Sequence, residues 1–119
     1  MAEGQQRGER QMDIDPGKAV EYIMKHSAEF AKAKAERVYL ENFLRSKKSI
    51  LMAKSSAKSV AAAEVDAYAD PEYIGLLEGL KEAVEAEEKL KWMLTAAQLK
   101  VEIWRSQEAT NRAIDNNAR

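Results

Sequence analysis

The sequence predicts an all-α protein: a long antiparallel helical hairpin of the coiled-coil type, which assembles into an oligomeric helical bundle. The first observation is a composition dominated by Ala, Glu, Lys, Leu and Arg, as is typical of long helices. The second is that both prolines, Pro16 and Pro71, directly follow an aspartate. The third is an apolar repeat at alternating steps of three and four residues after the second proline.

The chain divides into an N-terminal arm and one helical domain. Residues 1–14 are polar and lack a period, so we expect a flexible arm. Asp15-Pro16 and Asp70-Pro71 each place a capping carboxylate before a proline, which is favoured in the first turn of a helix. Neither another proline nor a glycine cluster interrupts the segments that follow. We therefore expect a hairpin over residues 15–119, with helices at about 16–68 and 71–114.

The second helix carries the clearer apolar seam, and Glu87 is its only interruption. Its members are Tyr73, Leu76, Leu80, Ala83, Leu90, Leu94, Ala97, Val101 and Trp104. The first helix shows a shorter stripe, after which apolar residues point in several directions. That stripe consists of Met24, Ala28, Ala31, Ala35 and Val38. A helix that is apolar on several sides needs more than one neighbour.

A hairpin folded about residue 70 would place residue i near residue 140 minus i. Segment 25–58 has a balance of +6 and segment 64–89 a balance of −7, so the fold would bring opposite charges together. Lys54 and Lys58 should then lie beside Glu82, Glu85 and Glu87. Small residues would also face one another near the turn, which would explain Gly75 and Gly79 as sites of close helix approach.

Three cations and one tryptophan are left unexplained by that register. Arg45, Lys47 and Lys48 would face residues 92–95, which contain no carboxylate. Trp92 falls on the outer face of the second helix. It begins a second apolar stripe, which we predict to be an oligomer interface and whose members are Trp92, Ala96, Leu99 and Ile103.

Signatures of catalysis and of metal or cofactor binding are missing. His26 is the only histidine and there is no cysteine, so neither His-containing di-metal motifs nor thiolate sites can form. Phosphate-binding glycine loops and nucleophile elbows are also missing. We expect a non-enzyme without a cofactor. No apolar run has the length of a membrane span or the character of a secretion signal, so we expect a cytoplasmic protein that does not contact membranes.

Single-stranded nucleic acid is a partner that the sequence leaves open. Proteins that bind single strands combine a basic track with aromatic rings on which bases stack. The weakly acidic net charge of −1 argues against a broad DNA footprint. The candidate residues for binding nucleic acid or a protein partner are Arg45, Lys47, Lys48, Trp92, Trp104 and Arg105.

Residues 35–113 carry a resemblance in three segments: LRSKKSILMAKSS, AYADPEY and YIGLLEGLKEAVEAEEKLKWMLTAAQLKVEIWRSQEATNRA. The chain resembles small phage-encoded helical proteins from early gene regions that contain recombination and replication genes. The resemblance implies a phage or prophage setting in the host bacterial cytoplasm. It also implies a role beside homologous recombination or strand annealing.

We therefore expect a non-enzymatic adaptor of phage DNA recombination or replication that acts through oligomeric coiled-coil contacts, with single-stranded DNA as an additional partner. The alternative is an inhibitor that docks on a host nucleoprotein or defence complex, in the manner of anti-CRISPR proteins, with the acidic 64–88 segment imitating nucleic-acid charge. A purely structural oligomer is the third interpretation.

Overall fold

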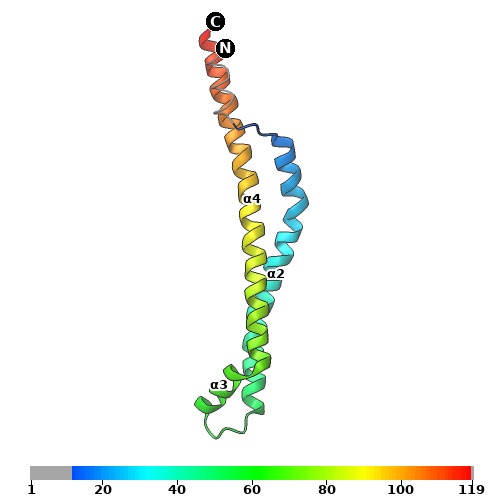
Figure 1. Cartoon of the computed structure of the whole chain (residues 1–119), viewed down its shortest axis with the longest axis vertical. Helices are drawn as coiled ribbons and strands as arrows, with labels where there is room; N and C mark the ends of the chain where they lie inside the picture. The colour runs from blue at the N-terminus through cyan, green and yellow to red at the C-terminus, as the bar shows by residue number, and fades with distance from the viewer. Residues whose placement is uncertain (1–11, 119) are drawn as a thin grey trace. The chain divides into compact units, whose positions relative to one another are not determined.

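The computed structural model describes residues 12–118, and these residues are all-α (Figure 1). Helix α2 spans Pro16–Lys54, α3 spans Val60–Ala69 and α4 spans Pro71–Ala118. The described residues form two compact units: residues 29–90, and residues 12–28 together with residues 91–118. Within each unit α2 and α4 run antiparallel, as the predicted hairpin requires. Among residues 12–118, no helix combines the length and the apolar character of a membrane span.

Both aspartate–proline pairs start helices, as predicted. The backbone N–H of Lys18 donates to Asp15 Oδ1 at 3.2 Å, and that of Glu72 donates to Asp70 Oδ1 at 2.8 Å. Each carboxylate thereby satisfies a donor of the first helical turn, which has no partner within the helix. Of the predicted arm, residues 1–11 lie outside the described part of the chain, and Met12–Ile14 are described and non-helical.

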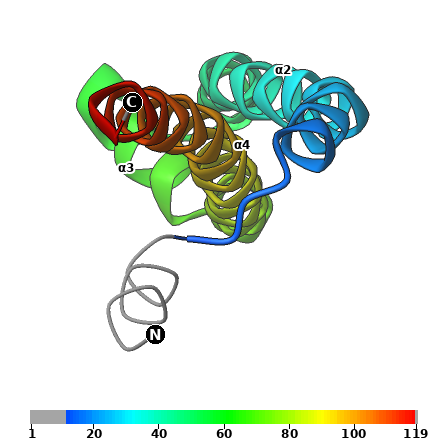
Figure 2. The same ribbon diagram turned by 90° about the horizontal axis from the view of Figure 1, so that it is seen from above.

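The first long helix ends earlier than predicted. Instead of one helix to about residue 68, α2 stops at Lys54 and the separate α3 begins at Val60, off the line of α2 in both views (Figures 1 and 2). Ser59 caps α3 by accepting a hydrogen bond from the backbone N–H of Ala62. The Ser55 hydroxyl bonds to Asp66 and accepts from the backbone N–H of Ala57. Such side-chain bonds compete with helical ones, so the serines interrupt the helix.

The seam of α4 is confirmed. All nine of its predicted residues are half-buried or buried, and so is the intervening Glu87. The helix continues to Ala118, beyond the predicted end at residue 114.

The apolar stripe predicted on the first helix is not the packed face of that helix, because its residues face outward. Met24 is 74% exposed and Val38 is 40% exposed. The face of α2 that is turned inward instead recurs from Ala19 at steps of four and three. It consists of Ala19, Ile23, His26, Phe30, Ala33, Arg37, Leu40, Leu44, Lys47 and Leu51. Because His26, Arg37 and Lys47 are polar, a search for regularly spaced apolar residues does not detect this repeat.

The predicted register was also wrong. Arg37 pairs with Glu87 and Lys47 pairs with Glu72, where the prediction would have put them near residues 103 and 93. The shift arises because residues 55–69, which were assigned to the long helix, form a loop and a short helix. Lys54 consequently lies near Glu72, whose pKa it helps to lower, and not beside the predicted glutamates.

The close approach predicted at the two glycines of α4 is not present. A Cβ atom added at Gly75 or at Gly79 would meet nothing within 4 Å. These positions therefore have room for a side chain, and helix packing does not require glycine there.

Candidate protein-interaction surface

The outward position of the predicted stripe on α4 is confirmed. Trp92 is 62% exposed, Leu99 49% and Ile103 37%, and the small Ala96 between them is exposed as well. We call these four residues the outer row. On the opposite side of the same helical turns, Ala97 is buried in the seam. Helix α4 is therefore apolar on two sides over residues 92–104.

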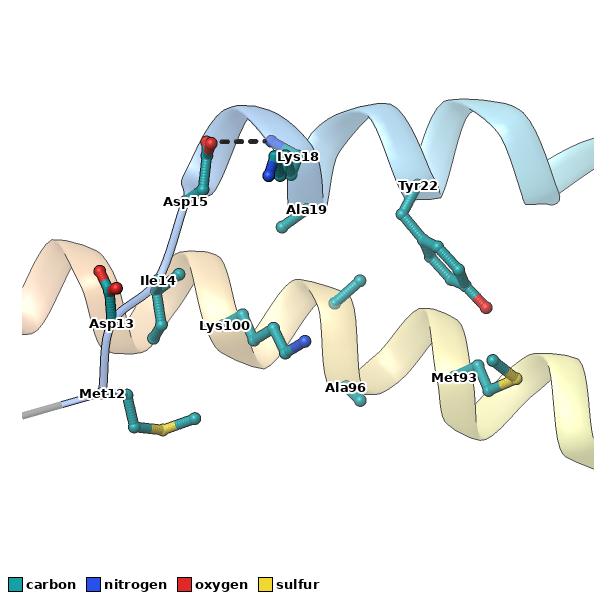
Figure 3. A pocket seen from close by; sticks show the side chains of 11 residues that line it. Met12, Asp13, Ile14, Asp15, Lys18, Ala19, Tyr22, Met93, Ala96 and Lys100 are labelled. Atoms are coloured by element: carbon teal, nitrogen blue, oxygen red, sulfur yellow. Dashed lines mark hydrogen bonds between the residues drawn. The ribbon is translucent and has the colours of Figure 1, made fainter.

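A cleft of about 960 Å³ opens beside the outer row (Figure 3). One wall is the start of α2 with Ala19 and Tyr22, and the other is α4 with Met93, Ala96 and Ala97. The rim carries charges of both signs, from Asp13, Asp15, Lys18 and Lys100. All of these residues belong to the unit formed by the two ends of the described chain. Ala96 belongs to both the cleft and the outer row.

The segment Met12–Ile14 closes part of this cleft. With its amide oriented to satisfy both partners, Gln107 accepts from the backbone N–H of Met12 at 3.0 Å and donates to its carbonyl at 3.3 Å. Met12 and Ile14 also line the cleft (Figure 3). The backbone ahead of α2 is therefore held on α4, which the sequence did not indicate.

Two of the three unexplained cations have partners within the chain. Lys47 forms an ion pair with Glu72, and this bond is the main reason why the pKa of the Glu72 carboxyl is lowered. Lys48 Nζ lies 3.1 Å from Glu64 Oε1 and 4.8 Å from the centre of the Tyr68 ring. Its contact with Tyr68 and then that with Glu64 raise the pKa of Lys48. Arg45 is exposed and shares a small cavity with Lys48.

The candidate nucleic-acid residues do not form one cluster within a unit. Arg45, Lys47 and Lys48 belong to the unit of residues 29–90. Trp92, Trp104 and Arg105 belong to the other unit. Trp104 is half-buried in the seam of α4, whereas Arg105 is exposed. Each unit therefore supplies only part of the basic and aromatic pattern that the sequence suggested.

The sequence interpretation missed a charge pair between a buried carboxylate and a half-buried arginine. Glu87 is 8% exposed, and Arg37 reaches it from α2 with two guanidinium nitrogens, Nε and Nη2, the latter 3.2 Å from Oε1. The bonds to Glu87 and then to Glu41 raise the pKa of Arg37 further above its already high value. The available signal was Glu87 itself, a charged residue inside an apolar seam.

No family model, curated protein or solved structure matches the chain significantly. Among the described residues, no group of three His, Cys, Asp or Glu side chains is arranged to hold a metal ion. The chemistry of this surface is therefore that of apolar helix faces with charged margins.

Proposed function

We propose that the chain is a non-enzymatic accessory or adaptor protein of phage DNA recombination or replication, which self-associates and binds partners through exposed helix faces. The observation that carries the proposal is the outer row, in which three large apolar side chains are at least one-third exposed on one face of α4. Large apolar patches on a soluble chain commonly mark interfaces. The phage setting rests on the resemblance of residues 35–113.

The small core of the described residues supports this proposal. Apart from Glu87, the buried residues are two leucines and four alanines, and no large side chain is fully buried. A chain with so little enclosed apolar area gains less from folding alone than a compact domain does. Further burial between chains would add the missing hydrophobic stabilisation.

Direct binding of single-stranded DNA would use few of the candidate cations. Lys47 and Lys48 would each have to leave a carboxylate partner in order to bind a phosphate. Arg45 carries no such ion pair among the described residues. We therefore expect at most one phosphate contact from these three cations.

The inhibitor remains the second candidate, because one observation favours it. Glu78, Glu82 and Glu85 are exposed at helical spacing on α4. The acidic face is nevertheless smaller than the sequence suggested, since Glu64, Glu72 and Glu87 are paired with cations of the same chain.

Light scattering coupled to size-exclusion chromatography tests the self-association. We expect an oligomer at micromolar concentration, and a shift toward the monomer in a Trp92→Glu/Leu99→Glu variant. Leu77→Glu is the matched control, because Leu77 lies on the same helix and is 43% exposed. A monomeric unmutated chain would reject self-association.

Recovery of a tagged chain from infected host cells tests the cellular role. We expect recombination, annealing or single-strand-binding proteins to be recovered with it. Recovery of a host defence complex in their place would favour the inhibitor. Fluorescence anisotropy with a labelled single strand at low salt then decides whether DNA is contacted directly.

A further inference from the structure

We infer that the outer row and the adjoining cleft bind a second copy of this chain, with the α4 helices of the two copies antiparallel over residues 92–103. The inference rests on the proposed self-association and specifies its partner, site and direction. It starts from the continuity of the apolar surface at Ala96, which the outer row and the cleft share.

The surface formed by the outer row and the cleft extends beyond the outward face of α4. It runs from Trp92 and Leu99 across Ala96 to Met93, and ends at the buried Ala97 inside the cleft. Within the outer row, the large Trp92 and Ile103 stand at the ends, and the small Ala96 lies between Trp92 and Leu99. A helix can approach closely over alanines while the larger side chains pack on either side of it, which is the shape that a second helix fits.

The spacing of the outer row selects one antiparallel register. Pairing Trp92 with Ile103 of the second copy also pairs Ala96 with Leu99 of that copy, and the two-fold symmetry repeats both pairs. This register places each member of the row opposite another member, and it sets Ala96 opposite the larger Leu99. The contact uses the same patch on both copies, as a two-fold symmetric dimer requires.

The size of the contact indicates that the cleft must take part. A helix segment of 12 residues is about 18 Å long and about 10 Å wide, so its outward face has a footprint on the order of 200 Å². A stable interface commonly buries about 800 Å² on each partner. The outer row alone is too small, and Tyr22 and Met93, which lie on the two walls of the cleft, supply further apolar surface.

The charges beside this surface are compatible with a second copy. The cleft rim balances Asp13 and Asp15 against Lys18 and Lys100. In the proposed register Lys100 lies across from Thr95 of the second copy, and Glu102 lies across from Met93. No like charges are therefore brought face to face along the row.

Cysteine cross-linking tests the register, because the chain contains no cysteine of its own. Lys89 and Ser106 are exposed on the same face of α4, just beyond the two ends of the row. In the proposed dimer Lys89→Cys of one copy faces Ser106→Cys of the other. A mixture of the two variants, carrying tags of different size, should form a disulfide-linked heterodimer on mild oxidation.

The single variants are the control for direction. Two Lys89→Cys positions would lie about 25 Å apart along an antiparallel pair, far beyond disulfide reach. Efficient self-linking of either variant would indicate parallel helices and overturn the inference. A chain that is dimeric by light scattering but yields no mixed disulfide would also overturn it, while leaving the proposed self-association intact. A monomeric chain would reject both.

A second pair of variants tests the role of Ala96. Ala96→Gln adds a polar side chain at the closest approach, and we expect it to weaken dimerisation at least about tenfold. Ala86→Gln, an exposed alanine of the same helix, should leave dimerisation unchanged. Equal dimerisation of the two variants would place the contact elsewhere. Circular dichroism checks that both remain helical.

Discussion

At the scale of single residues, Glu87 is the most unusual side chain of the described chain, because it is charged and buried within an apolar seam. Removing a carboxylate from water is costly unless a partner compensates, and Arg37 does so with two of its nitrogens. A seam position that requires a cation opposite it disfavours slipped pairings of the two helices. The pair therefore specifies which turns of α2 and α4 meet.

We expect Arg37→Leu to lower the midpoint of thermal unfolding, because it leaves the Glu87 carboxylate buried beside an apolar group. The double variant Arg37→Leu/Glu87→Leu should recover the midpoint to that of the unmutated chain or above it, since paired apolar residues avoid the desolvation cost. Circular dichroism melts of the three proteins measure the effect. A double variant less stable than the single one would contradict a compensating role for Arg37.

The ion pair of Lys47 with Glu72 predicts a dependence of stability on pH. The hydrogen bond and the charge of Lys47 lower the pKa of Glu72 in the folded chain. The pair therefore stabilises the fold above the unfolded-state pKa of glutamate, near 4.3, and this stabilisation is lost as pH falls through the lower folded-state pKa.

We expect Glu72→Gln to lower the unfolding midpoint at pH 7, and this effect should diminish as the pH falls from the unfolded-state pKa of glutamate, about 4.3, through the lower folded-state pKa of Glu72. Melts of both proteins between pH 3 and pH 7 give the comparison. Glu78→Gln is the control, since Glu78 is exposed and forms no ion pair with a described residue. A difference that stayed constant across this range would argue against the pair.

At the scale of elements, local chemistry predicted α4 better than α2. The caps at Asp15 and Asp70 depend on neighbouring residues alone, and the seam of α4 is apolar at nearly every position. The inward face of α2 includes Arg37 and Lys47, whose burial depends on carboxylates far along the chain. The apolar stripe of α2 that begins at Met24 looked more regular in the sequence than this inward face, although the stripe points outward.

The same difference explains which candidate site residues could be predicted. The exposure of Trp92 and Leu99 followed from the α4 seam, because the outward face of a helix is known once its inward face is known. The partners of Lys47 and Lys48 could not be predicted, since they require α3 to be a separate helix. Ser59 was the local signal for that break, but it was assigned to the interior of a long helix.

The open space at the glycines of α4 predicts that Gly79→Ala stabilises the chain. No neighbour obstructs the added Cβ atom, so the change should raise the free energy of unfolding by about 0.5 to 1 kcal/mol through lower backbone entropy in the unfolded chain. Ala86→Gly, at an exposed position of the same helix, should have the opposite effect of similar size. A loss of stability in Gly79→Ala would restore the close-approach interpretation.

At the scale of the whole molecule, the two units differ in the buried residues and ion pairs that stabilise them. The unit of residues 29–90 contains the buried Leu44, Leu51 and Glu87 and the three ion pairs between helices. Among the described residues of the other unit, only Ala19 and Ala97 are buried, and a cleft lies between its helices. Parts of a chain with few buried contacts open at lower free energy.

Hydrogen exchange should therefore separate the two units. We expect amides of residues 16–28 to exchange roughly tenfold faster or more than those of residues 37–51 on the same helix, because fewer buried contacts oppose their opening. Mass spectrometry of peptides from a dilute sample measures this difference.

Raising the protein concentration should then slow exchange at residues 16–28 and 92–103, because the inferred dimer covers the cleft and the outer row there. Residues 37–51 serve as the internal control. Equal exchange of the two α2 segments in the dilute sample would contradict the difference in stability, and exchange at 92–103 that did not depend on concentration would argue against the dimer contact.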